Sequence, residues 1–152
     1  MSGPSQVPPP PNPLLLPVLV TVTYLAALVA ASGMLSLALD RDVIDYPDAG
    51  PLLGVVMALA AGIVTWAGCS RATPRASPWI TAILTALLCF TGIVLVGAVG
   101  YSLIRGSLSW LLLASAHFAA SPFTVAAAVL SGAAVVGTWA LARLGRGGAS
   151  AR

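Results

Sequence analysis

The chain has 152 residues, of which 59% are hydrophobic and only 7% are charged, and its formal net charge is +3. A soluble domain carries roughly 25% charged residues, so the composition excludes a water-facing globule. The arginines stand at segment ends and do not form the basic patch of a nucleic-acid-binding protein. The sequence therefore predicts an all-α integral membrane protein, a four-helix transmembrane bundle that has the lipid bilayer as a partner and binds no nucleic acid.

The composition also indicates an origin. Arginine without lysine, together with abundant alanine, glycine, valine and proline, is typical of a GC-rich bacterial genome. The length leaves no room for a separate soluble domain beside the membrane part. We therefore expect a protein of the bacterial inner (plasma) membrane.

Residues 1–13 are predicted to form a disordered, proline-rich tail. Pro4, Pro8 to Pro11 and Pro13 forbid a helix and favour an extended polyproline II form. Such a tail is either a solvated leader or a docking peptide for a proline-recognising module. A secretory signal peptide does not fit, because no basic residue precedes the apolar run and the run exceeds the length of an h-region.

The first membrane span is predicted at residues 14–39, where Tyr24 carries the one ionisable side chain. A helix of this length reaches about 39 Å, more than the roughly 30 Å of hydrocarbon requires. Pro17 falls in its first turn, where a missing N–H does the least harm.

The next stretch holds every side-chain carboxylate of the protein, namely Asp40, Asp42, Asp45 and Asp48. A charged side chain at the centre of a bilayer costs roughly 2.5–3.5 kcal/mol, so we expect this stretch to lie in water. Calcium prefers such oxygen ligands, but the spacing lacks the glycine and glutamate of an EF-hand loop, and Arg41 competes for the carboxylates. We predict a solvated loop that sets the topology and no bound metal, with a divalent-cation site as the alternative.

The second span is predicted at residues 52–69. Small residues recur at every fourth position in it and just before it, at Gly50, Gly54, Ala58 and Gly62. This spacing places them in one stripe of a helix, the pattern that lets two helix backbones approach closely. The stripe predicts a tight helix–helix contact, through which the chain could pack against itself or against a membrane-protein partner.

The third span is predicted at residues 79–102, after a short polar turn. Ser77 and Pro78 are a helix-start signal, with serine as the cap and proline at the first helical position. Thr81, Thr85 and Cys89 then share one face of the helix. Their side chains are expected to bond backbone carbonyls or a neighbouring helix. The alternative interpretation is a polar conduction path along this face.

Residues 105–142 are too long for one span, because a single helix would measure about 55 Å. Ser121 and Pro122 form a second cap-and-proline signal, so we predict a break there and a fourth span at residues 122–142. Residues 107–120 are then a short extra helix, which lies in the interface or folds partly into the bundle. The glycine-rich residues 143–152 are predicted to be a basic, disordered tail.

Four spans place both termini on one side of the membrane. That side carries five arginines and the other carries two, so the positive-inside rule makes it cytoplasmic. The five are Arg71, Arg75, Arg143, Arg146 and Arg152. Tryptophan and tyrosine residues cluster near both expected boundaries, where amphipathic rings settle.

Catalytic machinery is not apparent in the sequence. There is one histidine, no glutamate and no aspartate inside a predicted span, and no nucleophile elbow, zinc motif or phosphate-binding loop. We therefore predict that the protein is not an enzyme and needs no cofactor. Cys69 and Cys89 lie in no Cys-x-x-Cys pattern and are expected to be small buried residues without a disulfide.

His117 stands on the predicted short helix, on the same side as the acidic loop. The sequence thus predicts a polar cluster of His117 with Asp40, Asp42, Asp45 and Asp48 at the outer face. The histidine is either a pH sensor or an interfacial residue bonded to water or backbone.

Two classes of function remain. The first is a non-enzymatic accessory or scaffold protein that packs through small-residue helix faces. The alternative is a pore-forming or transport protein, for example a small holin-like lesion former.

Overall fold

The computed structural model describes residues 14–40, 50–72, 77–107 and 109–149. Five helices follow one another as α1 (Leu15–Leu39), α2 (Gly50–Arg71), α3 (Pro78–Arg105), α4 (Trp110–Ala120) and α5 (Pro122–Ala149). The described part of the chain holds no strand, and α1, α2, α3 and α5 are long and apolar enough to cross a membrane. The predicted four-helix transmembrane fold with a short extra helix before the last span is therefore confirmed.

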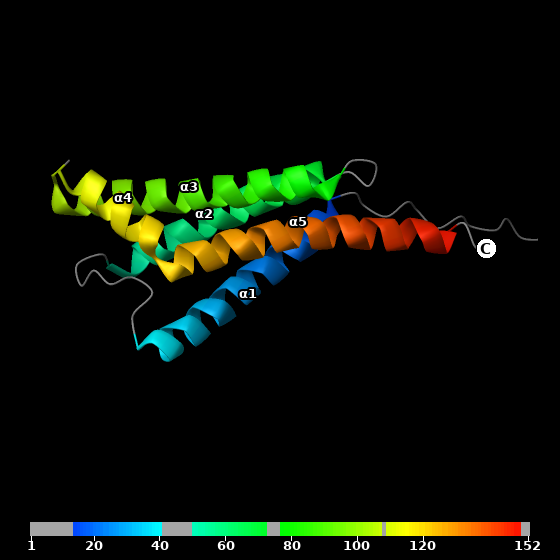
Figure 1. The fold of residues 1–152 in the computed structure, drawn as a ribbon, viewed down its shortest axis with the longest axis horizontal. Helices are drawn as coiled ribbons and strands as arrows, with labels where there is room; N and C mark the ends of the chain where they lie inside the picture. The colour runs from blue at the N-terminus through cyan, green and yellow to red at the C-terminus, as the bar shows by residue number, and fades with distance from the viewer. Residues whose placement is uncertain (1–13, 41–49, 73–76, 108, 150–152) are drawn as a thin grey trace, which may run out of the picture.

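The four long helices lie side by side, with α3 packed against α2, α4 and α5 (Figure 1). The start of α1, the end of α2, the start of α3 and the end of α5 share one end of the bundle, which we call the terminal end. Asp40 follows the last residue of α1 at the other end, the Asp40 end. Both ends of the described chain therefore lie on one side, as four crossings require.

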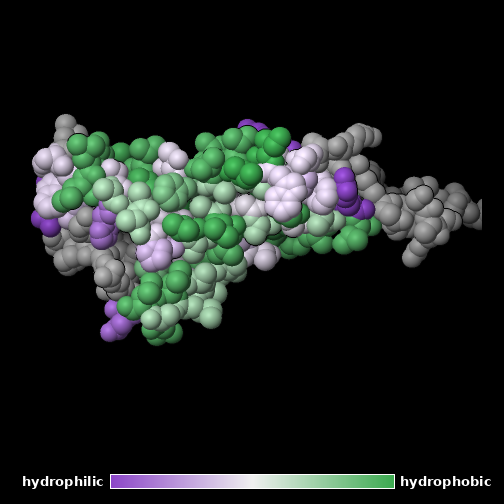
Figure 2. Space-filling view, viewed as in Figure 1, coloured by the Kyte–Doolittle hydropathy of each residue, from purple (hydrophilic) through white to green (hydrophobic). Residues whose placement is uncertain are grey.

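On the face shown in Figure 2, the surface between the two ends is largely apolar and hydrophilic residues gather toward the ends. Leucines such as Leu84, Leu87 and Leu88 of α3 are more than half exposed. A soluble protein rarely leaves so much contiguous apolar surface uncovered. In a bilayer these side chains face acyl chains, so the exposed leucines belong to the outer, lipid-facing wall of the bundle.

Helix α4 folds back along the Asp40-end part of α3. Its Ala114 and Phe118 are buried in a cluster with Ala98 and Tyr101 of α3 and Leu53 of α2. A β-carbon on Gly97 would lie 3.0 Å from the Phe118 ring, so glycine at this position leaves room for the aromatic side chain. Of the two places expected for the short helix, it occupies the one partly inside the bundle.

The predicted break at Ser121 and Pro122 is present. Ser121 has an extended backbone with ψ 128°, and α5 begins at Pro122. The Val125 N–H donates to the Ser121 carbonyl at 3.3 Å, the first turn of the new helix. Proline at the first helical position loses no bond, whereas inside a helix it would cost about 3 kcal/mol or more.

The expected disorder after residue 142 is wrong for residues 143–149, because α5 continues to Ala149. Glycine has a weak helix propensity, but extending an existing helix adds one hydrogen bond per residue and avoids the costly nucleation step. The other helices differ from the predicted spans by a few residues at their ends, and the short helix begins at Trp110 instead of residue 107. The proline-rich tail at residues 1–13 and the last residues 150–152 lie outside the described chain.

Candidate functional site

Helix α1 is the least embedded of the long helices. Its buried residues are Pro17 and Tyr24, and both lie in its first half. Toward Asp40 the helix separates from the rest of the bundle (Figure 1). At Gly33 a β-carbon would meet nothing within 4 Å, and Met34 is 73% exposed. The second half of α1 is therefore held by few contacts.

A cavity of about 430 Å³ lies where α1 departs. Its walls are formed by α1 between Leu28 and Gly33, by α2 between Gly54 and Ala61, and by the start of α5 up to Ala127. Ile93 and Phe118 add to the lining. Ser32, Ser121 and Thr124 are the polar side chains among the lining residues, so the cavity is mainly apolar.

The predicted small-residue stripe of α2 runs along this cavity. At Gly62 the stripe meets α1, because a β-carbon there would lie 3.3 Å from Leu25 Cδ2. Gly54 and Ala58 instead line the open space. Gly50 is the first residue of α2. The stripe thus has a helix partner at Gly62 and faces the cavity at Gly54 and Ala58.

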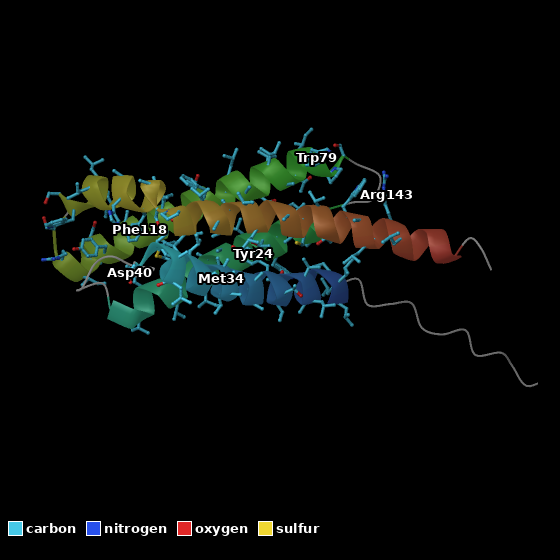
Figure 3. The ribbon with its side chains drawn as sticks, turned by 60° about the horizontal axis from the view of Figure 1, so that its bottom comes forward. Tyr24, Met34, Asp40, Trp79, Phe118 and Arg143 are labelled. Carbon is cyan, nitrogen blue, oxygen red and sulfur yellow. The ribbon has the colours of Figure 1, made fainter. Side chains whose placement is uncertain are left out.

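A small polar centre lies where the four long helices meet, and each helix contributes one side chain. The hydroxyls of Thr65 and Ser131 are 2.8 Å apart. The Tyr24 hydroxyl lies 3.6 Å from Cys89 Sγ and donates to the Ala127 carbonyl at 3.3 Å. Tyr24 is labelled in Figure 3. Cys89, Thr65 and Ser131 are fully buried. The polar centre therefore joins all four spans at membrane depth.

The polar centre forms the floor of the cavity. Ala61 and Ala127 line the cavity, and their carbonyls accept the hydrogen bonds of Thr65 and Tyr24. Ile93 and Leu28 line it one helical turn from Cys89 and Tyr24. In all four helices the lining residue is on the Asp40 side of its polar neighbour. The cavity therefore occupies the half of the bundle near the Asp40 end.

The buried polar side chains of the described residues all have hydrogen-bond partners. Thr85 donates to the Thr81 carbonyl at 2.7 Å, as the sequence predicted for this face. Cys69 and Cys89 are buried and form no disulfide, which confirms the expectation for both. The polar centre fastens helices together because unmet hydrogen-bonding groups are costly in hydrocarbon.

Arginine and aromatic side chains pair at both ends of the bundle. Near the Asp40 end the Arg105 guanidinium lies 5.3 Å from the Trp110 ring centre, and its Nε donates to the Tyr101 hydroxyl at 3.1 Å. Near the terminal end the Arg143 guanidinium lies 4.0 Å from the Trp139 ring centre. Such pairs suit the membrane–water interface, where a ring and a cation can both be partly solvated.

The predicted outer-face polar cluster stays a prediction. Asp40 is exposed and ends α1 in the left-handed conformation, with φ 48°. His117 is exposed on α4 and sets its ring edge-on to Phe118, with ring centres 6.0 Å apart. Asp42, Asp45 and Asp48 lie outside the described residues. Within the described ranges no three His, Cys, Asp or Glu side chains come close enough to hold a metal ion.

Thr65 and Ser131 are functional-site residues that the sequence pattern did not predict. Each is a polar residue inside an apolar span, and this position was an available signal. Whether such a residue faces the bundle or the lipid depends on how the helices pack. Exposed serines and threonines elsewhere in this chain look the same in sequence. The contacts of Tyr24 with Cys89 of α3 and Ala127 of α5 were not predictable from the sequence either.

Comparisons with known proteins give one family. The sequence model described as "Family of unknown function (DUF6121)" matches residues 13–150. No curated protein matches the chain. No solved structure matches it either. The matched range covers all five helices and the cavity between them.

Proposed function

Since the chain belongs to DUF6121, a family of unknown function, we propose a role from its own geometry. The protein is a multi-pass membrane protein. Within that class we propose a non-enzymatic accessory protein that binds an apolar partner inside the bilayer. The binding surface is the small-residue face of α2 together with the facing wall of α1.

One observation carries this proposal. The stripe that contacts α1 at Gly62 faces an open cavity at Gly54 and Ala58. Small residues on a transmembrane helix favour association because they let another group come close to the backbone. Here the small-residue face of α2 forms one wall of the cavity. The opposite wall is α1, which is packed into the bundle mainly through its first half.

The lining of the cavity favours binding over chemistry or conduction. Its polar side chains are two serines and a threonine, and no charged side chain is among the described lining residues. In the polar centre next to the cavity, Tyr24 and Thr65 are engaged in hydrogen bonds between helices. Ionisable residues inside membrane spans mark ion and proton pathways, and the described lining residues include none.

The binding role can be tested in living cells by photocrosslinking. Gly33 lines the cavity and has open space around it, so p-benzoyl-phenylalanine should fit there. We expect one discrete covalent product from position 33. The matched control is the same photoreactive residue at Leu87, which is exposed on α3 and is not a lining residue, and should give a dispersed background. Equal patterns from both positions would argue against a binding surface at the cavity.

The same cells test the pore alternative. We expect expression of the wild-type chain to leave the membrane potential and viability unchanged, because the polar centre joins the four spans across the middle of the bundle. A voltage-sensitive dye followed through induction measures this directly. Rapid depolarisation at modest expression would favour a lesion-forming protein instead.

For location we propose a bacterial inner membrane with both termini in the cytoplasm. The arginine bias of five to two supports this orientation. Reporter fusions at Ala49 and at the C-terminus test it. We expect the enzyme reporter that works outside the cytoplasm to be active at Ala49 and inactive at the C-terminus, and the reverse pattern would invert the topology.

A further inference from the structure

We propose that the cavity between α1, α2 and α5 holds one acyl chain of a membrane phospholipid, which enters from the leaflet at the Asp40 end. This inference rests on the proposed function, since it names the apolar partner that the same surface binds. The observations that carry it are the size of the cavity, its lining and its depth in the bundle.

The size fits a single hydrocarbon chain. The cavity measures about 430 Å³, which falls within the range of roughly 300–1,000 Å³ typical of small-molecule sites. It is close to three times the ~150 Å³ of an apolar cavity that accepts benzene. A site of this volume therefore has room for a good part of one acyl chain.

The volume of the cavity is also too small to hold a transmembrane helix. A helix is about 10 Å across with its side chains, so even three turns fill roughly 1,300 Å³. Insertion of a partner helix would require α1 to leave the bundle, and α1 is anchored through Tyr24 and Leu25. The cavity as formed is thus suited to a thin, flexible chain.

The lining matches an acyl chain that points toward the middle of the membrane. Ser32 and Ser121 lie toward the Asp40 end of the cavity, while Leu28, Ala61 and Ile93 lie next to the polar centre. A phospholipid of that leaflet has its headgroup at the Asp40 end and its chain terminus near the midplane. The terminal part of the chain would then lie among aliphatic side chains.

The bilayer itself supplies the occupant. Helix association in lipid gains no hydrophobic driving force, because lipid tails are as apolar as leucine. An unfilled cavity forfeits the dispersion contacts of its lining. A lipid chain that enters beside α1 restores these contacts, and Gly54 and Ala58 let it lie close to the backbone of α2.

The experiment uses the full chain in vesicles of phosphatidylethanolamine and phosphatidylglycerol, with a trace of phosphatidylglycerol that carries a diazirine midway along one acyl chain. After illumination, the labelled positions are mapped by peptide mass spectrometry. We expect lipid adducts at lining residues such as Leu28, Gly33 and Ala61 to exceed those at Leu87 and Leu88, which are exposed on α3. Adducts that are no more frequent in the lining than at these leucines would overturn the proposal.

A pair of variants sharpens the test. Ala58→Phe places a ring in the cavity and should abolish the lining adducts while those at Leu87 and Leu88 persist. Leu59→Phe, at the neighbouring exposed position of α2, should label like the wild type. Unchanged lining adducts in a folded Ala58→Phe protein would contradict the proposal. Should that variant not fold, the wild-type map alone decides.

Other outcomes separate this inference from the proposed function. Covalent dimers formed through the lining residues, in place of lipid adducts, would identify a second copy as the occupant and overturn the acyl-chain proposal. A discrete protein product from position 33 in cells, with no lipid adducts in vesicles, would also overturn the acyl-chain proposal. It would still support the proposed accessory role. Loss of both signals would remove the proposed function itself.

Discussion

Leucine in place of Gly68 should lower the free energy of unfolding by about 3 kcal/mol, the upper part of the usual range for overpacking a core. Gly68 of α2 is buried against α3, where an added β-carbon would lie 2.5 Å from Thr85 Cγ2 and overlap its hydroxyl. Thr85 has little freedom to move, because it is β-branched and its hydroxyl is bound to the Thr81 carbonyl at 2.7 Å. Unfolding in mixed detergent micelles, followed by circular dichroism, measures the loss.

The control for this prediction is Gly92→Leu on α3. A β-carbon on Gly92 would meet nothing within 4 Å, so the same substitution should change the stability by less than about 0.5 kcal/mol. A double-mutant cycle of Gly68→Ala with Thr85→Ala should show a coupling of at least about 0.5 kcal/mol, since the two side chains compete for one space. Equal losses for both leucine variants would mean that α2 and α3 are not in close contact at Gly68.

Tyr24→Ala should be the second large loss, about 3–5 kcal/mol, as for other buried aromatic residues cut to alanine. Tyr24 is 3% exposed and is the largest buried side chain of α1. Its removal leaves a void beside Cys89 and Ile93 and takes away the hydrogen bond from α1 to the Ala127 carbonyl. The free energy of unfolding in micelles should fall accordingly.

Two variants separate packing from hydrogen bonding at this position. Tyr24→Phe keeps the ring and loses the hydroxyl, so it should cost only about 0.6 kcal/mol, the average for such bonds between membrane helices. Thr23→Ala, at an exposed neighbour on α1, should have no measurable effect beyond its local bond to the Leu19 carbonyl. A loss in Tyr24→Phe as large as in Tyr24→Ala would show that the hydroxyl, and not the ring, anchors α1.

Much of the architecture could be predicted from the sequence, because hydrocarbon permits few backbone solutions. The four long apolar runs specify four spans, and the pair Ser121 and Pro122 locates the break between α4 and α5. The tail after residue 142 was misjudged because glycine content is a local property, whereas a helix that already exists propagates through weak residues.

The candidate site was harder to predict. The stripe from Gly50 to Gly62 is visible as a spacing in the sequence. The sequence does not say that α1 covers the stripe at Gly62 and leaves it uncovered at Gly54 and Ala58. Nor does it show that Thr65 and Ser131 face each other across 66 positions of chain. Both facts depend on the tilt and rotation of helices, which are set by neighbouring helices and not by hydropathy.

The shortness of α4 imposes an order on assembly. Eleven residues reach only about 17 Å as a helix, so this segment is too short to enter the bilayer as an independent span. Membrane helices first insert separately and then associate. Helix α4 must therefore take its place in the second stage, by packing against α3 once that span is in the membrane. Until then Tyr101 and Ala98 face lipid instead of Phe118, and the nascent protein is a looser set of helices than the finished one.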